Sequence, residues 1–113
     1  MKPLTITTSH APVGLVLAVS GDLDHTNAQR LRHSGQEAAA VAPGRLLEVN
    51  LNDLAFCDSS GITALIAVRN HVVSAGGEVV LVAVPANMRR LLHLTGLDQV
   101  FDIRDTVSPL TDR

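Results

Sequence analysis

The residues that could most directly carry chemistry are four in a row, Asp58-Ser59-Ser60-Gly61, where the chain is expected to turn from a strand into a helix. A helix begins with free N–H groups and the positive end of its dipole, and both favour an anion. A phosphate on Ser59 would therefore be tolerated by the fold, and it would add about −1.5 to −2 charge beside Asp58. The same four residues are also typical of an ordinary helix cap, and taken alone they favour capping.

Catalysis by Ser59 finds little support in the sequence. The serine does not lie in a Gly-x-Ser-x-Gly turn, and no histidine is placed by sequence as its base. We therefore expect no enzymatic activity, and a small hydrolase using Ser59 is the alternative from the enzyme class.

A second polar group, Asp22, Asp24 and His25, lies at the end of a predicted central strand. Binding sites of α/β sheets tend to lie at such strand ends, but a solvated turn with a capping aspartate explains the same residues. As a catalytic carboxylate pair the two acids lack supporting residues. The five histidines show no HxH or HExxH spacing, and no glycine-rich phosphate loop is present. We therefore expect neither a metal ion nor a cofactor.

Composition narrows the class of protein further. The 113 residues suit one domain, and their formal charge of −2 comes with no basic run that would mark a nucleic-acid surface. The single cysteine, Cys57, suits a reducing compartment. No stretch resembles a signal peptide or reaches the roughly 20 apolar residues of a membrane helix. We therefore expect a cytoplasmic protein that binds neither nucleic acid nor membrane and is a monomer or a weak dimer.

The apolar pattern predicts alternating strands and helices. Strands are expected at Leu4–Thr8, Val13–Val19, Leu46–Leu51, Val79–Val84 and Val100–Ile103, and helices at Thr26–Val41, Ser60–Ala75 and Pro85–Thr95. Thr26 and Gln29 have the spacing of a capping box, and Gly76 and Gly96 should end two helices. This order predicts a single α/β domain over 1–113, with a mixed, mainly parallel sheet of about four to five strands and helices packed against it. The core spans about 4–103, followed by a tail or short helix over 104–113.

The helix after Ser59 has two faces. Its apolar face is centred on Ala64, Leu65, Val68 and Val72. Ile66 lies between the faces, near Thr63 and Asn70. In the commoner case Ile66 widens the stripe that faces the core. In the other case these three residues form a partly exposed patch beside Ser59 that a partner covers.

Three stretches resemble the STAS domain family, and within it the bacterial anti-sigma factor antagonists. They are Gly21-Asp22-Leu23-Asp24 with Thr26 and Ala28, then Phe56-Cys57-Asp58-Ser59-Ser60-Gly61-Ile62, then Gly76-Gly77-Glu78 leading to Arg90-Leu91-Leu92 and Thr95-Gly96-Leu97. Each stretch is weak alone, but together and at these spacings they are specific. The resemblance runs from about Val13 to Phe101 and implies a STAS-type fold.

The resemblance also implies a switch. In the family, the serine directly after the aspartate, here Ser59, is phosphorylated by the partner, an anti-sigma factor and serine kinase with a histidine-kinase-like ATPase fold. The unphosphorylated form binds this partner and so releases a sigma factor, and a PP2C-type phosphatase restores that form. Asp24 and Asp58 match acidic positions of the family's interaction surface, while Ser60 and Gly61 match its helix start.

From the residues and the resemblance together, the partner is expected to contact Asp22, Asp24, His25, Asp58, Ser59, Ser60, Gly61, Thr63, Ile66 and Asn70. The last ten residues, which include Ser108-Pro109, lack the long final helix of many relatives. The alternative function is a STAS module that acts as a scaffold in a lipid-transport or ligand-sensing complex. Such modules often lack the serine that this chain keeps.

Overall fold

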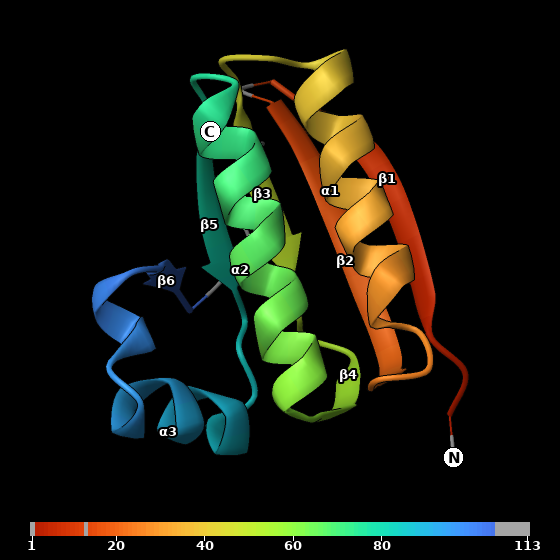
Figure 1. The fold of residues 1–113 in the computed structure, drawn as a ribbon, viewed down its shortest axis with the longest axis vertical. Coiled ribbons are helices and arrows are strands. Elements are labelled where there is room, and N and C mark those ends of the chain that lie inside the picture. The colour runs from red at the N-terminus through yellow and green to blue at the C-terminus, as the bar shows by residue number, and fades with distance from the viewer. Residues whose placement is uncertain (1, 13, 106–113) are drawn as a thin grey trace.

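The computed structural model describes residues 2–12 and 14–105, which form one mixed sheet with helices packed against it (Figure 1). The strands are β1 (Thr5–Ala11), β2 (Gly14–Leu23), β3 (Leu46–Asn50), β4 (Leu54–Cys57), β5 (Glu78–Val82) and β6 (Asp102–Arg104). The helices are α1 (Ala28–Val41), α2 (Ser59–Ser74) and α3 (Ala86–Leu94), followed by a short 3-10 helix, η1 (Leu97–Gln99). The predicted α/β class is confirmed, with one strand, β4, that the sequence pattern did not indicate.

The strands follow the order β1-β2-β3-β5-β6, and β4 pairs separately with the end of β2. Only β1 and β2 are antiparallel within the described chain, and the other pairs are parallel. The expected parallel connections from β3 to β5 and from β5 to β6 are therefore confirmed. Because parallel strands end at the same edge of a sheet, the segments that follow β2 and β4 lie next to each other at that edge.

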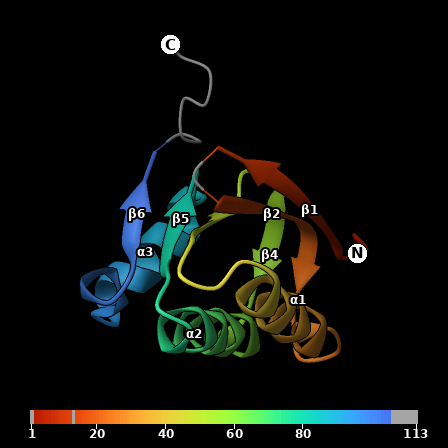
Figure 2. The same ribbon diagram turned by 90° about the horizontal axis from the view of Figure 1, so that it is seen from above.

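Most of the core lies between the sheet and two helices, α1 and α2, which lie side by side on one face of it (Figure 2). α3 adds Met88 and Leu92 to the same buried cluster. The centre of this core is made by side chains such as Leu17, Val49 and Leu81, which are inaccessible to solvent. Gly35 allows the two helices to approach closely, since a Cβ there would lie 2.6 Å from a methyl of Val68. The predicted apolar face of α2 is also confirmed, because all four of its central residues are buried.

Several element boundaries differ from the sequence prediction, among them the end of β1, which runs to Ala11 and not to Thr8. β2 runs to Leu23 because β4 supplies a partner for its final residues. α1 begins at Ala28, and the predicted capping box is wrong, because the Thr26 hydroxyl donates to Asp24 Oδ1 instead of capping the helix. The last strand, β6, begins at Asp102 because η1 and its turn occupy the residues before it.

The predicted end of α2 is confirmed in detail. Gly76 has φ of +86°, a left-handed conformation that suits glycine. Its N–H donates to Val73 O, and that of Gly77 donates to Val72 O, both at 2.9 Å. This pair of bonds is the Schellman motif, which satisfies carbonyl groups that the helix leaves unpaired.

The predictions for the end of the chain, including Ser108-Pro109, fall on 106–113 and lie outside the described residues. The stretch 104–105 contains the last residue of β6 and a bend. Among the helices described, none is long and apolar enough to cross a membrane.

Candidate partner-binding site

Ser59 lies at the first position of α2 and is exposed to solvent. The residue before it, Asp58, is the N-cap of the helix, and its Oδ1 accepts the N–H groups of Ser60 at 2.8 Å and Gly61 at 3.2 Å. Of the two interpretations of Asp58-Ser59-Ser60-Gly61, the structure confirms helix capping, because these two N–H groups are not free. Asp58 occupies them, so a group on the Ser59 hydroxyl would extend from a helix start that is already stabilised.

Gly61 allows the start of α2 to lie against the ends of β2 and β4. A Cβ at this position would lie 2.5 Å from Cys57 Sγ and 2.9 Å from two carbons of Leu23. Contacts of this length do not occur between real side chains, so a larger residue would push the helix start away from the sheet. The small residue after the two serines thus fixes the position of Ser59 relative to the strand ends.

A turn after β2 is organised by Asp24 and Asn27. Asp24 Oδ1 accepts both the hydroxyl and the N–H of Thr26, and the side chain of Asn27 bridges the Asp22 carbonyl at 2.8 Å and the Asp24 N–H at 2.9 Å. The hydroxyl of Thr26, followed by its N–H, lowers the pKa of Asp24 below its ordinary value. The Asp24 carboxylate therefore stays ionised at neutral pH and somewhat below the pH at which a free aspartate protonates.

The structure places the two polar segments side by side. Leu23, the last residue of β2, is in register with Cys57, the last residue of β4. The Asp58 N–H donates to Leu23 O at 3.2 Å, which joins the start of α2 to the end of β2. Asp24 and Asp58 each follow directly after these strand ends, so Ser59 lies in an acidic neighbourhood. His25 is exposed in the same turn.

The other predicted contact residues lie along one face of α2. Thr63, Ile66 and Asn70 follow Ser59 by four, seven and eleven residues, a spacing that keeps all four side chains on one stripe of a helix. Thr63 and Asn70 are exposed, and the Thr63 hydroxyl donates to the Ser59 carbonyl at 3.0 Å. Ile66 is half-buried and packs against the core. The stripe is thus mainly polar, with a partly accessible isoleucine in the middle.

Two residues of this region were not among the predicted contact residues. Asn27 is the side chain that fixes the turn after β2, although its type alone does not distinguish it from a solvated loop residue. Phe56 lies on β4 opposite Asp22 and is 51% exposed. In a chain with only two aromatic residues, a phenylalanine directly before the Cys-Asp-Ser segment is the signal that could have identified an exposed apolar contact.

Cys57 is predicted to be unreactive in the folded protein. Burial, and next to it the negative charge of Asp58, raise the pKa of its thiol from 9.0 to about 12. At pH 8 the reactive thiolate is then about 1,000-fold scarcer than in the unfolded chain. Alkylation by iodoacetamide should accordingly be about 1,000-fold slower in the native protein than in urea, measured by mass spectrometry. Equal rates would show that Cys57 is accessible and that the start of α2 opens readily.

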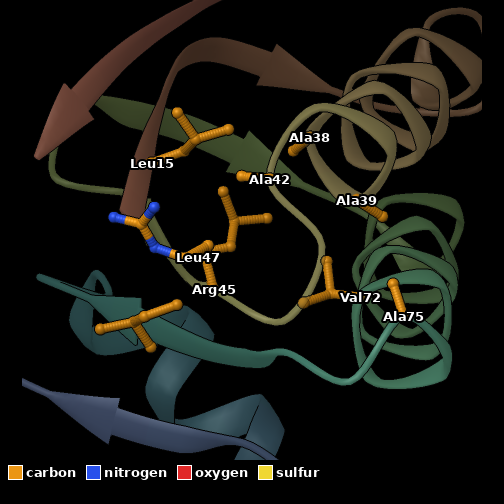
Figure 3. Close-up of a pocket in the computed structure, with 9 residues that line it drawn as sticks. Leu15, Ala38, Ala39, Ala42, Arg45, Leu47, Val72 and Ala75 are labelled. Carbon is orange, nitrogen blue, oxygen red and sulfur yellow. The ribbon is translucent and has the colours of Figure 1, made fainter. Parts of the chain in front are cut away.

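Other regions offer little that resembles a ligand site. Within residues 2–12 and 14–105, no group of three or more His, Cys, Asp or Glu side chains could hold a metal ion. The cavity in Figure 3 lies where α1 and α2 end, at the opposite end of α2 from Ser59, and is lined by small residues such as Ala38, Ala42 and Ala75. Its volume is about 10 Å³, which is close to the space of a single water molecule.

Comparisons with known proteins place the chain in a family. The STAS domain family matches residues 3–109. An anti-sigma F factor antagonist from Paenibacillus polymyxa is 30% identical over 110 residues, which cover 96% of this chain and 94% of that protein. An anti-sigma factor antagonist from Mycobacterium paratuberculosis, solved by crystallography, shares 28% identity with a TM-score of 0.81, over 93% of this chain and 88% of that one.

Similarity to SpoIIAA in its unphosphorylated form supports the fold alone, since the TM-score of 0.77 comes with 19% identity, over 92% of this chain and 90% of that one. The family match and the relative from Paenibacillus polymyxa each span nearly the whole chain. The chain therefore belongs to the STAS domain family, among the anti-sigma factor antagonists.

Proposed function

We propose that this chain binds an anti-sigma factor in its unphosphorylated form, and that phosphorylation of Ser59 ends that binding. The observation that carries the proposal is the position of Ser59: exposed, first in α2, and next to an aspartate that already caps the helix. The chain would act as a binding module without catalytic activity of its own. Its family and its relatives' names support the general role.

The acidic neighbourhood of Ser59 suggests the kind of surface that the partner presents. Asp24 and Asp58 lie at adjacent strand ends, and Asp22 lies on β2 just before them. A partner that covers this place must supply positive charge or hydrogen-bond donors, because buried carboxylates need compensation. A phosphate on Ser59 would add about −1.5 to −2 charge at the same point and exceed what the partner can compensate.

The fold would not oppose this modification. In the described residues, the hydrogen bonds of Ser59 use its main chain, as in the bond from Thr63 to its carbonyl. Ser59 is exposed, and its hydroxyl makes no hydrogen bond to the described residues, so a phosphate adds charge without removing an internal contact. Negative charge near a helix N-terminus is favourable by about 0.3 to 1 kcal/mol. The switch would thus act on the surface and leave the domain folded.

The partner that fits this scheme is an anti-sigma factor that is also the serine kinase for Ser59, with a histidine-kinase-like ATPase fold. A PP2C-type phosphatase would restore the binding form. The experiment is a pull-down of the tagged wild-type protein and of Ser59→Ala from native cells, with bound proteins and phosphopeptides identified by mass spectrometry. We expect phosphate on Ser59 in the wild type, and the same ATPase-fold protein bound to Ser59→Ala at higher occupancy.

Ser60 provides an internal control for the position of the phosphate. Its N–H is held by Asp58 and its side chain is half-buried, so it is less accessible than Ser59. Fragment spectra that place the phosphate on Ser60 would contradict the proposal. Capture of a transporter or sensor complex, with Ser59 unmodified through growth and stress, would favour the scaffold function instead.

A further inference from the structure

The outer edge of β1 is a second interaction surface, and we propose that two copies of the chain pair through it. β1 is the first strand in the sheet order and pairs with β2 along its whole length, from Thr5 with Ser20 to Ala11 with Gly14. Its other edge faces away from the sheet and has no strand beside it in the described chain (Figures 1 and 2). The main-chain groups along that edge are therefore available to another strand.

This edge lacks the features by which proteins usually prevent such pairing. β1 contains no Lys, Arg, Asp, Glu or Pro in its seven residues, and its register with β2 is continuous. The opposite edge of the sheet, β6, is only three residues long and carries Asp102 and Arg104. Of the two outer strands in the sheet order, only β1 is long, regular and free of Asp, Glu, Lys and Arg.

The sequence of β1 is complementary to itself about Thr8. In an antiparallel pair of two β1 strands centred there, Thr8 faces Thr8 of the second copy, Thr7 faces Ser9, and Ile6 faces His10. All seven residues of each strand take part, and Pro3 and Pro12 lie just beyond the paired region. Hydroxyl-bearing and β-branched side chains directly opposite one another stabilise antiparallel strands.

An open apolar groove beside the same strand favours a second copy as the occupant. It lies between β1 and α1, has a volume of about 360 Å³, and includes Thr8, His10 and Val41 in its lining. Val41 is 69% exposed. Ile6 is half-buried against the core of its own copy. In the pairing centred on Thr8, its accessible part lies opposite His10 of the second copy, at the rim of that copy's groove. The twofold arrangement covers both grooves with the two Ile6 side chains, and it closes after two copies.

Introducing a positive or a negative charge at Thr8 tests the pairing. Thr8 is exposed, so Thr8→Lys and Thr8→Glu should both fold. By sedimentation velocity from about 1 μM to about 1 mM, the range of weak interfaces, the wild type should form a dimer that increases with concentration. Each variant alone should lose the dimer, because like charges then face each other across the axis. An equal mixture of the two variants should restore it.

Gln99→Lys is the matched control, since it adds the same charge at an exposed position on η1, near the opposite edge of the sheet. It should dimerise like the wild type. A wild type that is monomeric over the whole range would overturn the proposal, as would Thr8→Lys that dimerises unchanged. Failure of the mixture to recover would overturn the register centred on Thr8. None of these outcomes bears on Ser59, because the pairing uses a different surface.

Discussion

Ser59→Asp is expected to weaken binding of the anti-sigma factor by about 100-fold or more and to leave the protein folded. A like charge placed in a close, acidic contact costs several kcal/mol, and about 3 kcal/mol corresponds to a factor of more than 100 in the dissociation constant. Phosphorylated Ser59 should lose more than the Asp variant, since a phosphate carries nearly twice the charge. Titration calorimetry with the purified partner measures all three forms.

Stability should hardly change in the same variant. Ser59 is exposed, its side chain is not needed to cap α2, and Asp58 keeps its bonds to the N–H groups of Ser60 and Gly61. The favourable interaction of a new carboxylate with the helix start, about 0.3 to 1 kcal/mol, is partly offset by repulsion from Asp58. Thermal unfolding followed by circular dichroism should therefore give midpoints within a few degrees of each other.

Two control variants show whether the loss of binding comes from negative charge at Ser59 or from any substitution in α2. Ser59→Ala keeps the surface neutral and should bind as tightly as the wild type. Ser74→Asp makes the same chemical change at the exposed last residue of α2, far from the strand ends, and should also bind normally. If Ser59→Asp bound as tightly as Ser59→Ala, electrostatic exclusion would be the wrong mechanism. If Ser74→Asp lost binding, the partner would cover the other end of α2.

The main elements were predictable because local sequence specifies them. The strand at Val79–Val84 is apolar throughout, as expected for a parallel strand buried on both faces, and β5 covers most of it. Gly76 and Gly96 end their helices in the left-handed conformation that was expected. Each of these predictions depends on a short window of residues, so no knowledge of distant contacts was needed.

The elements that were missed depend on contacts between distant parts of the chain. β4 has four residues, two of them exposed, and it is a strand because the end of β2 lies beside it. The extension of β2 to Leu23 has the same cause. Thr26 has the spacing of a capping residue, but its hydroxyl donates to Asp24 Oδ1 instead. The side chain of Asn27 then stabilises the turn by accepting the Asp24 N–H. The conformational preferences of a short segment cannot predict which strand or side chain it pairs with once the chain is folded.

The candidate site was predictable in composition but not in geometry. Motif spacing singled out Asp24, Asp58 and Ser59, and the structure places all three at adjoining strand ends. The bonds that Asp58 makes to the helix start, and the contact of Gly61 with Cys57 and Leu23, follow from the angle between α2 and the sheet. That angle is set by packing of the whole core, which no single motif encodes.

Gly21→Ala is expected to lower the free energy of unfolding by about 2.5 to 5 kcal/mol. Gly21 has φ of +90°, where an alanine costs about 1 to 2 kcal/mol. A Cβ there would also lie 2.0 Å from the Pro3 carbonyl oxygen, so the segment before β1 must move. This movement breaks the bond from the Asp22 N–H to Lys2 O and exposes Leu4, which is 5% exposed in the native fold. Loss of that burial adds about 1.5 to 3 kcal/mol.

Gly44→Ala isolates the conformational part of this effect. Gly44 also has a positive φ, +77°, but a Cβ there would meet nothing within 4 Å. Urea unfolding of both variants should therefore show a loss of about 1 to 2 kcal/mol for Gly44→Ala and roughly twice that for Gly21→Ala. The difference measures how firmly the first residues are held against β2. Equal losses would mean that the Pro3 contact contributes nothing, and that Asp22 gains no support from the N-terminal segment.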